Sequence, residues 1–154
     1  PRVIDARNAF TLTSLLGEVA RSGTAAKATA TLKRNDLYGK TGTTNDAVDA
    51  WFAGYQPGVA AVVWMGYDKP RSLGSNAFGA SLSLPIWIDF MSYALKGVPV
   101  AEPAVPEGVL NIGGDWYFEE FAHGAGVASL GLEDKLPAAP NEEERSGILD
   151  LFRR

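Results

Sequence analysis

The sequence of 154 residues contains no cysteine and only one histidine, His123. Disulfides and cysteine-built metal sites are therefore excluded, and one histidine cannot by itself build a histidine-rich site, so we expect no metal or cofactor. No run approaches the roughly 18 consecutive apolar residues of a membrane span, and the N-terminal stretch PRVIDARNAF lacks the apolar core of a signal peptide. Because an initiator methionine is also missing, we expect the chain to start inside a longer protein.

Charge and proline content divide the chain into two parts. Residues 1–100 contain 10 Lys and Arg against 7 Asp and Glu, whereas residues 101–154 contain 4 against 11. The acidic second part argues against a nucleic-acid partner, because no continuous basic surface remains. The proline-rich stretch that begins at Val98 is typical of an extended linker. We therefore expect a folded domain over residues 1–97 and a dispensable, partly disordered extension over residues 98–154.

The hydrophobic pattern predicts two helices around three strands in the first part, while residues 24–36 have too weak a pattern for a prediction. The predicted elements are Arg7–Arg21, Leu37–Asn45, Ala50–Tyr55, Val59–Tyr67 and Ser83–Lys96. Connections this short make the three strands antiparallel neighbours, because a parallel crossover needs about a dozen residues or more. The third strand is apolar throughout, which favours a central place in the sheet.

The second helix is expected to begin with Ser83 as its cap and to lie across one face of the sheet. Its apolar stripe consists of Leu84, Trp87, Ile88, Met91 and Leu95. Further along the chain, residues 115–124 alternate imperfectly and predict a short strand, and residues 136–147 have the composition of a disordered segment.

The stretch YGKTGTTNDAVDAWFAGY, residues 38–55, is open to two interpretations. A phosphate-binding loop needs a glycine at position 34, where Arg34 stands, and a helix directly after Lys40 and Thr41, where strand-forming residues follow. Both tests fail. The alternative is the Lys-Thr-Gly triplet of penicillin-recognising serine enzymes, in which a strand edge docks an extended peptide beside a nucleophile.

The surroundings of the triplet strengthen the second interpretation. GKTGTTND is followed by DAWFAGY, AAVVWMGYD and LPIWIDFM, and is preceded by SLLGEVARSGTAAKA. Over residues 1–100 this series resembles the C-terminal portion of class A penicillin-binding proteins, the bifunctional peptidoglycan synthases. The resemblance implies the α/β fold of β-lactamases and penicillin-binding transpeptidases, an antiparallel sheet flanked by helices on both faces, present here as a C-terminal fragment.

The resemblance also implies a role for each residue of the motif. Lys40 would organise the hydrogen bonds and the electric field around the nucleophile. The hydroxyls of Thr41 and Thr43 would bind the terminal carboxylate of a D-Ala-D-Ala stem peptide or a β-lactam, and the backbone N–H of Thr43 would be an oxyanion-hole donor. Gly42 and Thr44 complete the expected substrate-binding set, with Gly42 allowing close approach.

The sequence departs from the family pattern because no serine is followed three positions later by lysine and no Ser-x-Asn triplet occurs. We therefore expect the nucleophilic serine in the remainder of the same polypeptide, together with an upstream membrane anchor at the periplasmic face of the bacterial inner membrane. The isolated chain should be inactive. A D,D-carboxypeptidase, a serine β-lactamase or a non-catalytic binding module of the same fold are the alternatives.

Other candidate residues have simpler structural explanations. Asp46 and Asp49 could form a carboxylate pair, but a structural role, capping a turn or pairing with a basic residue, is the better expectation. His123 and the Glu142–Glu144 run are expected at the surface. Four large aromatic residues could stack on a ligand, but we expect them to pack in the core: Trp51, Phe52, Trp64 and Trp87.

Overall fold

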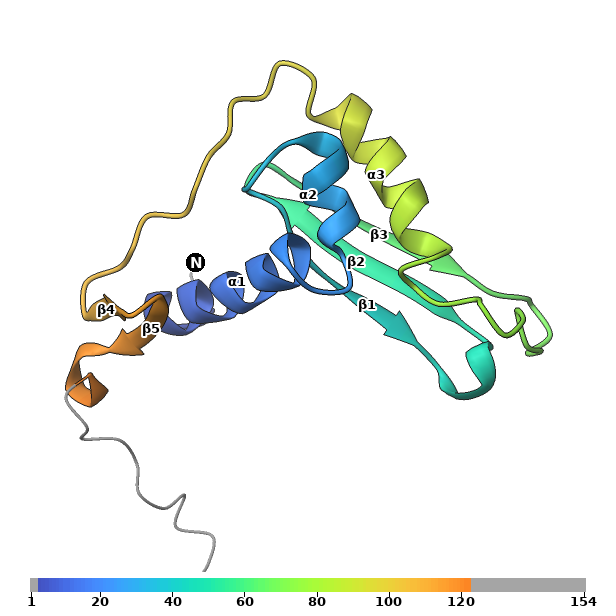
Figure 1. The fold of residues 1–154 in the computed structure, drawn as a ribbon, viewed down its shortest axis with the longest axis horizontal. Helices are drawn as coiled ribbons and strands as arrows, with labels where there is room; N and C mark the ends of the chain where they lie inside the picture. Colours follow the sequence, from blue (N-terminus) through green and yellow to red (C-terminus); the bar gives the residue numbers. More distant parts are fainter. Residues whose placement is uncertain (1–2, 123–154) are drawn as a thin grey trace, which may run out of the picture. The chain divides into compact units, whose positions relative to one another are not determined.

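The computed structural model describes residues 3–122 (Figure 1). The predictions for His123, for Glu142–Glu144 and for residues 136–147 lie outside the described residues. The chain forms two units, residues 1–109 and residues 110–154. The first unit contains the helices α1 (Ala6–Arg21), α2 (Ala26–Leu32) and α3 (Ser83–Ala94), the strands β1 (Tyr38–Thr43), β2 (Ala50–Gln56) and β3 (Val59–Met65), and the 3-10 turn η1 (Asn45–Ala47).

The three strands form one antiparallel sheet in the order β1-β2-β3, as the short connections predicted. The prediction that the third strand is central was wrong: β2 is central, and β3 is an outer strand within residues 3–122. Its apolar residues do not all lie inside, since Val62 is 63% exposed. An apolar run therefore reports the hydrophobicity of both faces of a strand but not the strand's position in the sheet.

Alternation along the strands gives the sheet two different faces. Tyr38, Lys40 and Gly42 pair with Tyr55, Ala53 and Trp51, so these six residues share what we call the Lys40 face. Thr41 and Thr43 lie on the opposite face with Phe52 and Ala50, which we call the Thr41 face.

Helix α3 covers the Thr41 face. All five residues of its predicted apolar stripe are buried, and Trp87 packs edge-on against Phe52 with ring centroids 5.0 Å apart. The indole N–H of Trp87 also donates to the carbonyl of Ala61, 3.1 Å away. The prediction that Ser83 caps this helix was wrong, because the cap position is Leu82 and the buried Ser83 hydroxyl donates to the carbonyl of Ala50 at 2.8 Å. Ser83 therefore ties the helix to the sheet.

Helix α1 lies on the Lys40 face, so helices flank both faces of the sheet as expected. The hydroxyls of Thr13 and Tyr55 are 2.8 Å apart, and Leu16 lines a cavity together with Lys40 and Ala53. Helix α2, which the sequence did not predict, places the buried Ala28 in the same core as Phe52 and Trp87.

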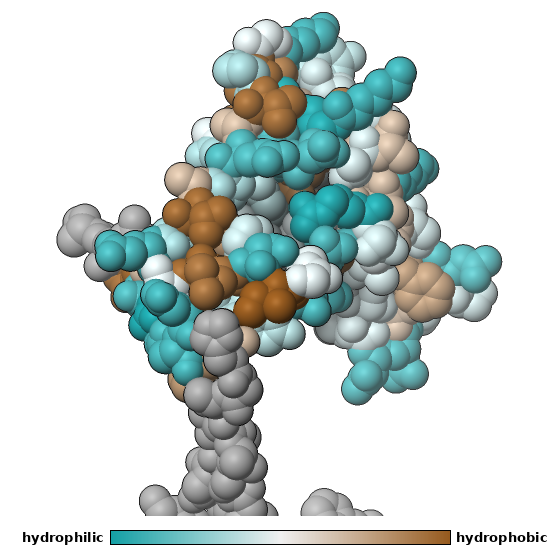
Figure 2. All heavy atoms as spheres, turned by 60° about the vertical axis from the view of Figure 1, so that its left-hand side comes forward, coloured by the Kyte–Doolittle hydropathy of each residue, from teal (hydrophilic) through white to brown (hydrophobic). Residues whose placement is uncertain are grey.

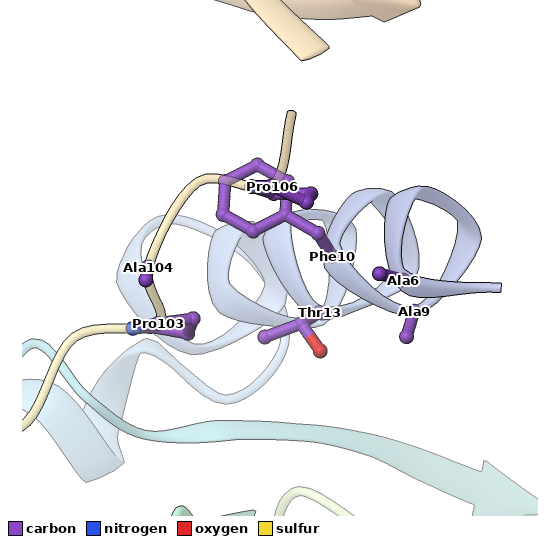
Figure 3. Close-up of a pocket in the computed structure, with 7 residues that line it drawn as sticks. All are labelled: Ala6, Ala9, Phe10, Thr13, Pro103, Ala104 and Pro106. Atoms are coloured by element: carbon purple, nitrogen blue, oxygen red, sulfur yellow. The ribbon is translucent and has the colours of Figure 1, made fainter. Parts of the chain in front are cut away.

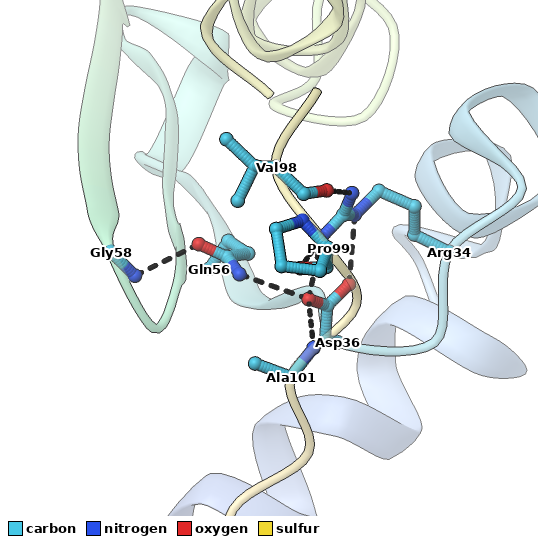
Figure 4. A network of polar contacts seen from close by, with 7 residues as sticks. All are labelled: Arg34, Asp36, Gln56, Gly58, Val98, Pro99 and Ala101. Carbon is cyan, nitrogen blue, oxygen red and sulfur yellow. Dashed lines mark hydrogen bonds and ion pairs between the residues drawn. The ribbon is translucent and has the colours of Figure 1, made fainter. Parts of the chain in front are cut away.

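The linker segment, residues 98–109, has no regular structure before Val109 but is held to the domain by a buried ion pair (Figure 4). The Asp36 carboxylate is fully buried and accepts from Arg34 at 2.7 and 2.9 Å, from Gln56 at 3.0 Å and from the Ala101 N–H at 3.0 Å. Arg34 also donates to the carbonyls of Val98 and Pro99. These contacts join the linker segment to Arg34 and Asp36 within the first unit, while the dispensability of residues 98–154 stays a prediction.

Beyond this anchor the linker segment runs beside α1. Pro103, Ala104 and Pro106 line a cavity of about 240 Å³ with residues of α1, among them Phe10 and Thr13 (Figure 3). The proline side chains supply apolar contact in a stretch whose backbone forms no strand ladder.

The second unit contains a hairpin and a 3-10 turn, η2 (Glu119–Phe121). β4 (Val109–Ile112), which begins at the unit boundary, pairs with β5 (Asp115–Phe118), and Gly113 and Gly114 adopt positive φ angles of 66° and 102° in the turn between them. β5 lies in the stretch for which a short strand was expected, whereas β4 was not predicted. Two glycines with positive φ make the tight connection possible.

The buried ion pair gives a first prediction. Asp36→Asn leaves the charge of Arg34 without its partner, so the free energy of unfolding should fall by about 3 kcal/mol at pH 7. Hydrogen exchange of the Ala101 amide should accelerate in the variant. Asp89→Asn, on the exposed side of α3, is the matched control and should leave both quantities unchanged.

The pH dependence follows from the same contacts. Burial alone would raise the pKa of Asp36, but the hydrogen bonds from Arg34, Gln56 and Ala101, with the charge of Arg34, hold this pKa below its ordinary value. The stabilisation is therefore complete above about pH 4, the ordinary pKa range of Asp, and is lost as the pH falls through the depressed value. A stability difference between wild type and Asp36→Asn that stayed constant down to pH 2 would contradict this assignment.

Candidate functional site

The Lys-Thr-Gly triplet lies on β1, an outer strand of the sheet. The N–H of Thr44 donates to the carbonyl of Asp49 at 3.1 Å, toward β2. Because successive N–H groups of a strand point in opposite directions, those of Thr41 and Thr43 point away from β2. No strand of residues 3–122 pairs with this side of β1, which we call the outer edge.

Lys40 folds its side chain over the outer edge. The ammonium Nζ donates to the carbonyl of Thr41 at 3.0 Å and to its hydroxyl at 3.4 Å. Lys40 is exposed and Thr41 is half-buried, so a ligand can reach both. A positive charge, a hydroxyl and outward N–H groups thus stand together within four consecutive residues, which suits an anionic or extended peptide ligand.

Thr43 lies on the Thr41 face of the sheet, where it contacts the loop between β3 and α3. Its hydroxyl accepts from the N–H of Gly79 at 3.2 Å. A Cβ built on Gly79 would stand 2.3 Å from the carbonyl oxygen of Trp51 and 2.9 Å from that of Gly42, so only glycine permits this approach. The sequence offered no sign of Gly79, since the contact joins positions far apart in the chain.

Thr44 closes the turn that follows β1. Its hydroxyl accepts from the N–H of Asp49 at 2.8 Å. The carboxylate of Asp49 accepts from the indole N–H of Trp64 at 2.9 Å, while Asp46 adopts a left-handed φ of 58° in η1. Asp49 therefore has a structural role, with its backbone in the turn and its carboxylate bound to Trp64 of β3, and the segment around Asp46 is a turn.

The aromatic residues divide between the two faces. Phe52 and Trp87 are buried as expected, but the core assignment was wrong for Trp51 and Trp64, which are 42% and 46% exposed. Their rings lie 6.0 Å apart on the Lys40 face, and Trp51 adjoins Gly42. Strand alternation puts them opposite Phe52, on the face that α3 does not cover.

Apolar residues line a cavity beside Lys40 on this face. The cavity has a volume of about 350 Å³ and lies between Leu16 of α1 and the sheet residues Ala53 and Val62. On α1 itself, Leu12 and Leu15 are 53% and 61% exposed, so its apolar residues are not all turned inward. Figure 2 likewise shows hydrophobic residues exposed among hydrophilic ones on the face drawn there.

Within residues 3–122, no three His, Asp or Glu side chains gather as a metal site would require. None of the helices in this part of the chain has the length and apolar content needed to cross a bilayer.

Comparisons with known proteins agree on one kind of protein. No protein-family model matches the chain. Penicillin-binding protein 1A of Neisseria cinerea is 45% identical over 99% of the chain, and that of Pseudomonas aeruginosa is 39% identical over 98%. The chain covers only 19% and 20% of these two relatives.

The crystal structure of penicillin-binding protein 1A from Haemophilus influenzae matches with a TM-score of 0.68 and 33% sequence identity, covering 71% of this chain and 18% of that one. With the observed helices and antiparallel sheet, this match establishes the transpeptidase-like α/β fold.

A second prediction concerns the approach of Gly79. Gly79→Ala introduces a Cβ that clashes with backbone carbonyls, so the loop must move off β1, and the free energy of unfolding should fall by about 1–3 kcal/mol. Hydrogen exchange of the amide at position 79 should accelerate, because its bond to Thr43 breaks. At Gly58 a Cβ would meet nothing closer than 3.4 Å, so Gly58→Ala is the control. Equal, small effects of both changes would contradict the close packing.

Proposed function

Because this chain is homologous over most of its length to a segment of penicillin-binding protein 1A, we propose that it supplies the Lys-Thr-Gly strand of a peptidoglycan D,D-transpeptidase. The observation that carries the proposal is the outer edge of β1. There the ammonium of Lys40 lies 3.4 Å from the hydroxyl of Thr41, and the N–H of Thr43 points outward two residues further on.

Each group has a role in acyl transfer. Lys40 and the hydroxyls of Thr41 and Thr43 bind the terminal carboxylate of a D-Ala-D-Ala stem peptide or of a β-lactam, and the field of Lys40 favours the ionised nucleophile. The N–H of Thr43 stabilises the oxyanion of the tetrahedral intermediate, a contribution of about 2.7–4 kcal/mol for such a donor. Gly42, which has no side chain, lets the substrate backbone lie against the strand.

The reaction proceeds through an acyl-enzyme. A serine elsewhere in the polypeptide attacks the carbonyl of the D-Ala-D-Ala bond, the terminal D-Ala leaves, and the amine of a second stem peptide then releases the serine by forming the cross-link. We place the reaction at the periplasmic face of the bacterial inner membrane, where stem peptides are the substrates and β-lactams acylate the same serine.

A hydrolase of the same fold, a carboxypeptidase or a β-lactamase, would use the same edge with water in place of the amine. Product analysis with an amine acceptor separates these activities. A binding module without a nucleophile would hold the carboxylate but form no acyl-enzyme. The nucleotide-binding alternative lacks support, because Lys40 and Thr41 lie within a strand and the next long element is another strand.

A third prediction tests the role of Lys40 in the full-length polypeptide. Lys40→Ala removes a charge-assisted hydrogen bond worth about 1.5–3 kcal/mol, so the rate constant for acylation by penicillin should fall at least about tenfold. Lys27→Ala, an exposed lysine on α2, is the control and should acylate at the wild-type rate. Wild-type acylation by a folded Lys40→Ala protein would rule out the proposed site.

A fourth prediction concerns the isolated chain. Because none of its serines is followed three positions later by lysine, the 154-residue chain should form no covalent adduct with a fluorescent penicillin. Denaturing gel electrophoresis after incubation measures this directly. A stoichiometric, heat-stable label on the isolated chain would show that it carries its own nucleophile.

A further inference from the structure

The turn between α1 and α2 brings one polar side chain to the triplet. The hydroxyl of Thr24 lies 3.1 Å from the hydroxyl of Thr41, across 17 residues of sequence. Thr24 is exposed, and the hydroxyl of Thr41 that it contacts is also the one that Lys40 contacts.

The backbone around Thr24 is firmly held. The N–H of Gly23 donates to the carbonyl of Glu18 at 3.1 Å, and the N–H of Ala25 donates to that of Val19 at 3.0 Å. A Cβ at Gly23 would stand 2.9 Å from the Cα of Val19, so glycine is needed for the chain to turn this closely. Ala25 is fully buried. Thr24 therefore projects from a turn that is fixed on both sides, which is the arrangement that a precise polar contact needs.

Either hydroxyl of the Thr24–Thr41 pair can be the donor, and only one of the two arrangements leaves the proton of Thr41 available to a ligand. The hydroxyl oxygen of Thr41 has two lone pairs and one proton. The Lys40 ammonium donates into one lone pair, from 3.4 Å. If Thr24 donates into the other, the proton of Thr41 is left to point at a ligand. Without Thr24, the hydroxyl of Thr41 can turn and accept from water or ligand donors instead.

We infer that Thr24 is a positioning residue of the site on β1: its hydroxyl orients that of Thr41 so that Thr41 donates to the carboxylate of the bound ligand. This inference rests on the proposed function of the triplet. It adds to the site a residue from the α1–α2 turn that lies outside the Lys-Thr-Gly strand.

The test compares Thr24→Val, Thr24→Ser and Thr13→Val in the full-length polypeptide. The probes are benzylpenicillin, which has a free carboxylate, and its methyl ester. Loss of one neutral hydrogen bond corresponds to about fivefold in rate. Thr24→Val should therefore slow acylation by benzylpenicillin about fivefold and change acylation by the ester little. Thr24→Ser, which keeps the hydroxyl, should be acylated by benzylpenicillin at the wild-type rate.

Thr13→Val is the matched control, because it removes a similar hydroxyl pair, with Tyr55, from α1. It should not change the preference for the acid over the ester. Wild-type kinetics of Thr24→Val, or an equal loss for acid and ester, would overturn the role of Thr24 while leaving the proposed function intact. Absence of acylation in the wild-type protein would instead overturn the proposed function itself.

Discussion

The register between β1 and β2 is the constraint on which the site depends, and polar contacts hold it at both ends of the strand pair. At one end Asp36, just before β1, accepts from Gln56 at the end of β2. At the other end Thr44 and Asp49 bond to each other twice across the turn. A slip of one residue would exchange the two faces of β1 and turn the outward N–H of Thr43 toward β2.

Two segments from different parts of the chain contact β1. The loop before α3 meets Thr43 through Gly79, and the α1–α2 turn meets Thr41 through Thr24. Neither contact contributes much apolar burial, so both depend on backbones that are held elsewhere, by the buried Ser83 and Ala25. The buried core therefore influences the site indirectly, because it fixes the backbones from which Gly79 and Thr24 reach β1.

The sequence predicted those features that local patterns encode. The antiparallel meander followed from the short connections, the buried stripe of α3 from helical spacing, and the fold from the motifs around Lys40. Features that depend on distant partners could not be predicted. The exposure of Trp51 and Trp64 depends on which face a helix covers, and the attachment of the linker segment depends on Arg34 and Asp36, more than 60 residues from Val98 in sequence.

The tryptophans of the first unit differ in exposure, so their fluorescence can report on the surroundings of β1. Trp51 is 42% exposed and adjoins Gly42, whereas Trp87 of α3 is fully buried against Phe52 of the sheet. A ligand that packed against Gly42 on the Lys40 face would replace water around Trp51 and leave the surroundings of Trp87 unchanged. Emission from Trp51 should then shift while that of Trp87 does not, so occupancy of the strand could be followed without attaching a dye.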